Sequence, residues 1–220
     1  MSSPPGVAVF DLDGTLTWRD TLVGFLVGYV VRHPRRWLRA WRVPLALARY
    51  ALQGRDRGLL KSRLVRAAMG GESRAAIDRW ADVYAHSLRP RGKYRLAALR
   101  TVEEHRGAGD TLILMSASVD LYVPRIGAQL GFDSTICTEV RWAGDELDGA
   151  LATANRRGEE KRRCLEALRL RYPGRPITAY GNSASDIPHL CAADHAVLVN
   201  ARPAARREAR AAGIAIDDWH

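Results

Sequence analysis

Four short apolar runs recur along the chain, and turn or acidic residues follow them. These runs are Val7 to Asp11, Thr111 to Met115, Ile177 to Tyr180 and Ala196 to Val199. The helical patterns between and after them cover Leu121 to Leu130, Glu159 to Leu170 and Ala204 to Ala212. Continuous apolar strands that alternate with helices are typical of a parallel sheet covered on both faces. The pattern therefore predicts an α/β fold with a doubly wound parallel sheet.

The segment between the first two runs has a different pattern. Residues 20–106 contain no convincing strand and at least four helical segments, of which Glu72 to Leu88 is a clear amphipathic repeat. We therefore predict a core formed by residues 1–19 and 107–220 and a helical cap formed by residues 20–106. Turn residues within Glu139 to Leu151 predict a β-hairpin in the core.

The composition is that of a globular protein. Of 220 residues, 47% are hydrophobic and 26% are charged, which excludes disordered, collagen-like and coiled-coil chains. The cysteines, Cys137, Cys164 and Cys191, are too far apart for a zinc site or a disulfide framework, which favours a reducing compartment. No signal peptide is recognisable, and the longest apolar stretch, Leu22 to Val31, is about half a bilayer span. We therefore expect a cytoplasmic protein.

The net charge of +10 is concentrated in the predicted cap. Between Arg32 and Arg66 there are eleven basic residues and one acid, Asp56, so this window accounts for the whole excess. A basic segment suggests nucleic acid, an anionic membrane surface or an anionic substrate as partner.

Two carboxylates follow the first apolar run, in the segment Asp11-Leu12-Asp13-Gly14-Thr15. Ligands of open α/β sheets bind at the carboxyl ends of the strands. There, one of the two carboxylates can attack a substrate or bind a metal while the other moves protons. A polar turn is the alternative. A calcium loop is excluded because its twelfth position would be Leu22 instead of glutamate.

Three later segments strengthen the catalytic interpretation. Ser116 directly follows the second apolar run, although a helix N-cap is an alternative for it. Lys161 is one of three lysines in a chain with 31 arginines, so a compact point charge is favoured over a solvated side chain. Asn182 and Asp186 lie one helical turn apart after the third run, where an N-cap box is the alternative.

In this order and at these strand ends, the four segments resemble the haloacid dehalogenase-like hydrolase superfamily. The resemblance implies that Asp11 attacks a phosphoryl group and forms an aspartyl-phosphate. It implies that Asp13 protonates the leaving oxygen and then activates the hydrolytic water, and that Thr15 supports the loop. Ser116, the adjacent Ala117 and Lys161 would hold the phosphoryl oxygens.

The same resemblance implies a Mg²⁺ cofactor. Its ligands would be the Asp11 carboxylate, the Asp13 backbone carbonyl and Asn182, with Asp186 orienting the shell. Mg²⁺ suits such a site because it prefers few carboxylates together with water and phosphate oxygens. The family usually has aspartate at the position of Asn182, so we expect somewhat weaker Mg²⁺ affinity here.

The helical insertion resembles the subgroup that contains phosphoserine phosphatases and bacterial phosphatidylglycerophosphatase C. The opening segment from Asp11 to Pro34 is more similar to the second, which predicts a lipid phosphate substrate such as phosphatidylglycerophosphate. The alternative is a phosphatase of phosphoserine or another small metabolite. In that case Asp20 would bind the amino group of the substrate and Arg63 its carboxylate.

The basic part of the cap allows two further interpretations. Its arginines alternate with apolar residues, namely Arg35, Arg36, Arg39 and Arg42 with Trp37, Leu38, Trp41 and Val43. Such a surface predicts a peripheral contact with the inner membrane face, unless the aromatic residues pack inward and the arginines are only solvated. A nucleic-acid-binding protein is an alternative of a different class. It is disfavoured because no known module is present and the aspartates would have no role.

Overall fold

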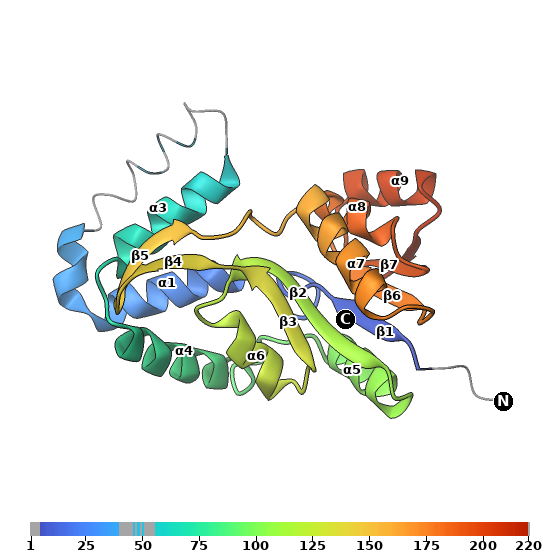
Figure 1. Cartoon of the computed structure of the whole chain (residues 1–220), viewed down its shortest axis with the longest axis horizontal. Helices are drawn as coiled ribbons and strands as arrows, with labels where there is room; N and C mark the ends of the chain where they lie inside the picture. The colour runs from blue at the N-terminus through green and yellow to red at the C-terminus, as the bar shows by residue number, and fades with distance from the viewer. Residues whose placement is uncertain (1–4, 40–45, 47, 49, 51–55, 220) are drawn as a thin grey trace.

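The structure is a computed structural model that describes residues 5–39, 46, 48, 50 and 56–219 (Figure 1). Its central element is a six-stranded parallel sheet with the strand order β3-β2-β1-β6-β7-β8. The strands are β1 (Val7–Phe10), β2 (Thr111–Val119), β3 (Ser134–Thr138), β6 (Ile177–Gly181), β7 (His195–Val199) and β8 (Ala215–Asp217). The predicted doubly wound sheet is confirmed, and β3 and β8 are strands that the apolar pattern did not indicate.

Helices cover both faces of this sheet because successive side chains of each strand point to opposite sides. Ala8 and Phe10 of β1 belong to one hydrophobic cluster, which includes residues of α5 (Leu96–Gly107) and α6 (Val123–Gln129). Val7 and Val9 belong to the other. That second cluster includes residues of α7 (Glu159–Arg171), α8 (Ile187–Leu190) and α9 (Pro203–Ala211).

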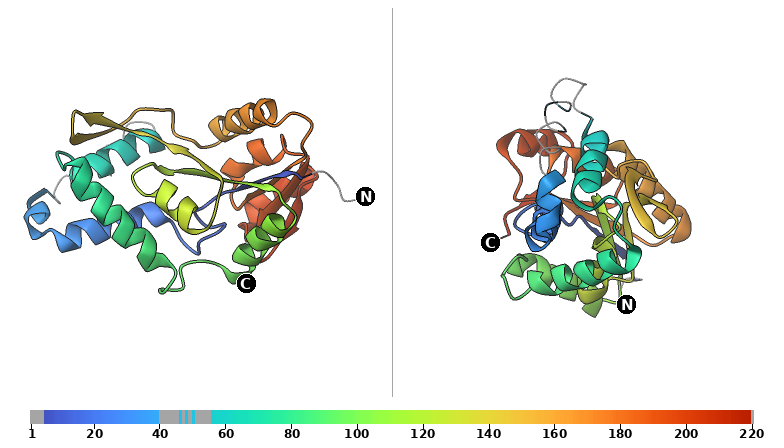
Figure 2. Two further views of the ribbon diagram at one scale, coloured as in Figure 1. Left: turned by 60° about the horizontal axis from the view of Figure 1, so that its bottom comes forward. Right: turned by 90° about the vertical axis from the view of Figure 1, so that its left-hand side faces the viewer.

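The insertion between β1 and β2 is helical, as predicted. We call its elements the cap: α1 (Thr21–Arg32), the 3₁₀ helix η1 (Pro34–Arg39), α3 (Arg57–Met69) and α4 (Arg74–Leu88). Figures 1 and 2 show the cap at one end of the molecule and α7 to α9 at the other. The amphipathic face of α4 buries Trp80 and Tyr84, and Phe25 of α1 stacks on Tyr122 of the core at 4.5 Å between ring centroids. Aromatic packing thus anchors the cap on the core.

The cap ends earlier than the sequence indicated. Helix α5 falls within the predicted cap, yet it contacts β2, and its buried residues Ala98 and Val102 pack in the same cluster as β1. We therefore place the end of the insertion before Leu96 and not at residue 106. The predicted hairpin is present as β4 (Val140–Ala143) and β5 (Glu146–Leu151), and β5 packs against α3 of the cap.

The structure describes only some of the residues of the predicted membrane surface. Arg36 donates a hydrogen bond to the carbonyl oxygen of Gly70 at 2.8 Å and forms an ion pair with Glu72, so it binds within the cap. Trp41, Arg42 and Val43 lie outside the described residues, as do the side chains of Trp37, Leu38 and Arg39. Among the helices of the described part, none combines the length and the apolar character needed to cross a bilayer. Peripheral membrane contact stays a prediction.

Candidate active site

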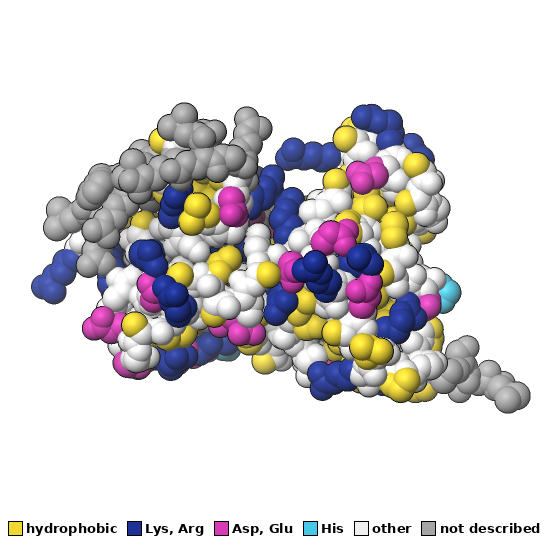
Figure 3. Space-filling model, turned by 45° about the horizontal axis from the view of Figure 1, so that its top comes forward, with side chains coloured by type: hydrophobic (Ala, Val, Ile, Leu, Met, Phe, Trp, Pro, Cys, Tyr) yellow, Lys and Arg dark blue, Asp and Glu magenta, His cyan; other side chains and the backbone are white. Residues whose placement is uncertain are grey.

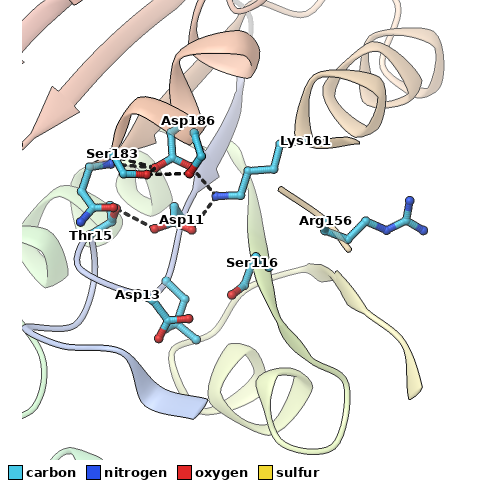
Figure 4. A network of polar contacts seen from close by, with 12 residues as sticks. Asp11, Asp13, Thr15, Ser116, Arg156, Lys161, Ser183 and Asp186 are labelled. Carbon is cyan, nitrogen blue, oxygen red and sulfur yellow. Dashed lines mark hydrogen bonds and ion pairs between the residues drawn. The ribbon is translucent and has the colours of Figure 1, made fainter. Parts of the chain in front are cut away.

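A cavity of about 320 Å³ opens at the carboxyl ends of β1, β2 and β6. The predicted residues that line it are Asp11, Asp13, Asp20, Ala117, Lys161, Asn182 and Asp186. They come from segments up to 175 residues apart in the sequence, from Asp11 to Asp186, which parallel pairing brings to one edge of the sheet. Figure 4 shows Asp11, Lys161 and Asp186 directed toward one another.

Lys161 joins the two carboxylates at the centre of this cavity. Its ammonium donates to Asp11 Oδ1 and to Asp186 Oδ1, both at 2.6 Å, and the side chain is almost fully buried. Burial alone would lower the pKa of Lys161, but the charges of Asp11 and Asp186 outweigh it and hold that pKa above its ordinary value. The lysine is therefore a permanent positive charge beside Asp11.

Asp11 is a buried carboxyl group whose pKa is raised above its ordinary value. Burial raises its pKa to about 7; the Lys161 ammonium opposes this shift, and the carboxylates of Asp186 and Asp13 add to it. The hydroxyl of Thr15 donates to Asp11 Oδ2 at 2.9 Å, so the side chain is held by a donor on each oxygen. Any cation bound beside Asp11 would favour its charged form.

Asp13 lies two residues further along and is held by the cap and by β2. Its Oδ1 accepts hydrogen bonds from the backbone N–H and the hydroxyl of Thr21, and its Oδ2 accepts one from the Ser118 hydroxyl, all at 2.6 Å. Burial raises the pKa of Asp13, with the nearby charge of Asp20 adding to the shift and the donors opposing it. A raised pKa suits a carboxyl that must carry a proton.

The turn after β6 approaches the β1 loop very closely. Gly14 has a φ of 89°, and a Cβ at this position would lie 2.0 Å from Asn182 Nδ2. Asp186 Oδ2 accepts hydrogen bonds from the backbone N–H of Asn182 and from both the backbone N–H and the hydroxyl of Ser183. One oxygen of Asp186 thus caps the turn while the other contacts Lys161. The N-cap interpretation of this segment and the catalytic one are compatible.

Ser116 lies elsewhere than the sequence predicted. Because β2 continues to Val119, Ser116 is inside the strand, fully buried, and its hydroxyl oxygen accepts a hydrogen bond from the Ser118 backbone at 3.0 Å. Both predictions for Ser116, a position at the end of the strand and a helix N-cap, are therefore wrong. Ala117 and Ser118 line the cavity, and Ser118 was missed although its spacing of two from Ser116 places both on the same side of a strand.

Of the two cap residues predicted for the site, Asp20 lines the cavity and Arg63 does not. Asp20 reaches the cavity, but its Oδ1 caps α1 by accepting from the backbone N–H groups of Leu22 and Val23. Arg63 of α3 is not among the lining residues, whereas Arg57 and Lys61 of the same helix are. The lining positions of α3 are Arg57, Leu60, Lys61 and Leu64. This i, i+3, i+4, i+7 spacing marks one helix face and could have identified them.

The donors in the cavity fit a small, hard cation. Asp11 and Asp186 both bind the Lys161 ammonium through their Oδ1 atoms, and they line the same cavity as Asn182, whose side-chain amide carries a further oxygen. Across residues 5–39 and 56–219, no group of three or more His, Cys, Asp or Glu side chains is arranged to hold a metal. Mg²⁺ commonly uses only one or two carboxylates and completes its shell with water and phosphate oxygens, so this oxygen-rich set suits it.

Comparisons with known proteins agree with this geometry. The family model of haloacid dehalogenase-like hydrolases matches residues 8–190. Protein CicA of Caulobacter vibrioides is 32% identical over 200 residues, which cover 88% of this chain and 86% of that protein. A protein of unknown function from Bordetella pertussis has a similar structure, with a TM-score of 0.80 at 20% identity, covering 98% of this chain and 99% of the other.

A further solved structure has the same fold with a cap. It is a probable phosphoserine phosphatase from Vibrio cholerae, with a TM-score of 0.72 at 16% identity, covering 99% of this chain and 61% of that one. At this identity the likeness concerns the fold alone. The family match spans most of the chain and includes the segments of Asp11, Lys161 and Asp186. The protein therefore belongs to the haloacid dehalogenase-like hydrolases.

Proposed function

We propose that the protein is a Mg²⁺-dependent phosphomonoesterase that works through an aspartyl-phosphate on Asp11. The observation that carries this proposal is the position of Asp11 at the end of β1. There it faces the cavity, is bound to Lys161, and lies two residues from a second carboxyl that is partly buried, Asp13. A nucleophile, a fixed cation and a proton carrier in one cavity are the groups that phosphoryl transfer needs.

The reaction has two steps, phosphoryl transfer to Asp11 and hydrolysis of the aspartyl-phosphate. Asp11 attacks the phosphorus while the bond to the leaving oxygen breaks, and Asp13 gives that oxygen its proton. A water then attacks the phosphorus of the aspartyl-phosphate while the bond between Asp11 and the phosphorus breaks and Asp13 takes the proton of that water. Inorganic phosphate leaves, and the Asp11 carboxylate is regenerated. Lys161, Ser116 and the backbone at Ala117 are proposed to hold the phosphoryl oxygens, and Thr15 keeps Asp11 oriented.

Mg²⁺ would be held by Asp11, the Asp13 backbone carbonyl, Asn182 and Asp186. When bound, it supplies positive charge that offsets the negative charge of the phosphoryl oxygens. Asn182 brings a neutral oxygen where the family usually has a carboxylate, so we expect weaker binding. Support for this ligand set comes from the presence of Asp11, Asp13, Asn182 and Asp186 in the lining of one cavity.

A lipid phosphate is the substrate class that we propose. Beyond the polar groups, the cavity has an apolar wall built by α1 and α3, namely Leu22, Val23, Leu26, Leu60 and Leu64. Such a wall suits a leaving group with hydrocarbon parts, because contact removes apolar surface from water. Phosphatidylglycerophosphate is the example that the sequence suggested.

Phosphoserine, or another small metabolite, is the second candidate. The fold of a probable phosphoserine phosphatase and the presence of Asp20 in the cavity favour it. Against it, Arg63 does not line the cavity, and Asp20 already caps α1. A nucleic-acid surface is the weakest candidate, because several arginine and lysine side chains of the basic segment already bind within the protein or face the cavity. Arg36 and Arg66 form ion pairs, and Arg57 and Lys61 face the cavity.

The test is a substrate panel measured with and without Mg²⁺. It compares phosphatidylglycerophosphate, lysophosphatidate, phosphoserine, sugar phosphates and nucleotides, using the wild type, Asp11→Asn and the matched control Asp145→Asn on an exposed loop. Asp11→Asn should lose turnover by about a thousandfold or more while it stays folded. Acid-quenched wild-type protein should carry a phosphoryl group on the Asp11 peptide. Retained turnover in Asp11→Asn, with the control unchanged, would refute the mechanism.

A further inference from the structure

Among the described residues, three cationic side chains line the candidate cavity besides Lys161. Arg57 and Lys61 come from α3 of the cap, and Arg157 comes from the segment before α7 of the core. Figure 3 shows Lys and Arg side chains gathered around the hollow between the two ends of the molecule. We call Arg57, Lys61 and Arg157 the cation trio.

The cation trio has no acidic partner in the described part of the chain, in contrast to neighbouring bases. Arg66 of α3 pairs with Asp148, and Lys161 is neutralised by Asp11 and Asp186. Lys61 donates to two neutral oxygens, the Ala117 carbonyl and Asn155 Oδ1, the second at 2.6 Å. Neither Arg57 nor Arg157 forms an ion pair with any carboxylate that the structure describes.

The members of the trio are close enough to repel one another. Burial lowers the pKa of Arg157 and the positive charge of Arg57 lowers it further, while the charges of Asp186 and Asp11 oppose the shift. Burial also lowers the pKa of Lys61 to about 8; Asp13 and Asp20 oppose the shift, and Arg157 adds to it. Like charges held together beside a cavity are stabilised when an anion binds between them. The cavity therefore carries positive charge on Arg57, Lys61 and Arg157 that no ion pair of the described residues neutralises.

We propose that Arg57, Lys61 and Arg157 form a second anion-binding site that selects substrates carrying another anionic group besides the phosphate monoester. This inference rests on the proposed phosphatase function and narrows its substrate class. The second group is a carboxylate or a phosphodiester, since guanidinium and ammonium donors bind the oxygens of both. Phosphatidylglycerophosphate has the diester and phosphoserine has the carboxylate, whereas lysophosphatidate has neither.

Two matched substrate pairs separate the two sources of the anion. Phosphoethanolamine is phosphoserine without its carboxylate, and phosphatidate carries the monoester of short-chain phosphatidylglycerophosphate without the diester. If the second anion is a carboxylate, the kcat/KM of phosphoserine should be at least about tenfold higher than that of phosphoethanolamine. If it is a phosphodiester, the kcat/KM of phosphatidylglycerophosphate should exceed that of phosphatidate by the same factor. One charge-assisted hydrogen bond corresponds to a factor of this size or more.

Variants test whether the trio causes that preference. Arg57→Gln, Lys61→Gln and Arg157→Gln should each reduce kcat/KM for the preferred substrate about tenfold or more, mainly through KM. The partner without the second anion should change less than about threefold, so the ratio within the pair moves toward one. Arg79→Gln, an exposed arginine on α4 of the cap, is the matched control and should leave both substrates unchanged.

The outcomes also distinguish this inference from the proposed function. If wild-type protein hydrolyses no phosphate monoester with Mg²⁺, the proposed function fails. If it hydrolyses both members of each pair equally, the second anion site is refuted while the phosphatase stands. Equal losses for both members in the trio variants would also overturn the inference, because the trio would then serve the transferred phosphoryl group. Circular dichroism of each variant shows whether it is folded.

Discussion

Replacement of Lys161 by methionine removes the ammonium that joins Asp11 to Asp186. The two carboxylates remain in a buried site, and Lys161 itself is only 2% exposed, so little water can replace its charge. Breaking a buried ion pair by removal of one partner costs about 3 to 5 kcal/mol. For a chain of this size that corresponds to a fall in melting temperature of about 6 to 20 °C.

The loss should depend on pH in a definite direction. Asp11 has a pKa of about 7 in the folded protein against an ordinary value of 3.8, so it already reduces stability as the pH rises through this range. Without Lys161 the pKa of Asp11 rises further, and the pKa of Asp186, now below its ordinary value, rises too. Both carboxylates can then accept protons in the folded state at acid pH. Lys161→Met should therefore be much less stable than the wild type at pH 8 and closer to it at pH 5.

Urea denaturation at the two pH values measures this difference, with Lys93→Met, at an exposed position, as the control. The double variant Lys161→Met/Asp186→Asn removes one of the uncompensated charges, so it should recover part of the stability at pH 8. Equal midpoints for Lys161→Met and the wild type at pH 8 would refute the reasoning. The same is true of a loss that is as large at pH 5 as at pH 8.

Three other substitutions test separate parts of the structure. Gly14→Ala should cost about 1 to 3 kcal/mol in thermal unfolding, because φ is 89° there and the new Cβ would meet Asn182; an unchanged melting temperature would contradict this close approach. Asn182→Asp should bind Mg²⁺ about tenfold more tightly by calorimetry, since it adds a carboxylate to the site, and equal or weaker binding would show that Asn182 is not a ligand. Asp120→Asn should gain about 1 to 2 kcal/mol at pH 8 and nothing near pH 4. Burial raises the pKa of Asp120 from 3.8 to about 6, so the cost of its charge appears only above that range, and an equal gain at both pH values would disprove it.

Much of the fold followed from local patterns. Continuous apolar runs such as Val7 to Phe10 must be buried on both sides, which requires a sheet covered by two layers of helices. The strands β3 and β8 escaped notice because β3 begins with Ser134 and Thr135 and β8 is only three residues long. Their pairing with β2 and β7 makes them strands, and such pairing is invisible in a short stretch of sequence.

The main chemical groups of the site were also readable in the sequence. Asp11, Asp13, Lys161 and Asp186 are polar residues placed at the ends of apolar runs or at the start of a helix, and parallel strands direct those ends to one edge. Ser116 was misplaced because β2 extends four residues beyond Met115 through its pairing with β3, where Val119 faces Thr138.

The sequence by itself determined four of the six strands of the sheet, the helical insertion and the segments that line the cavity, because each depends on periodicity or on residues that are near one another in the chain. The tertiary structure decided which arginine and lysine side chains form ion pairs and which ones line the cavity. Arg36 and Arg66 are paired, Arg63 is on another face of α3, and Lys61 reaches into the cavity beside Arg157 of the core. The run of positive charge looked uniform in the sequence, but for the arginines and lysines that the structure describes, the orientation of each helix and the acids packed against it set their roles.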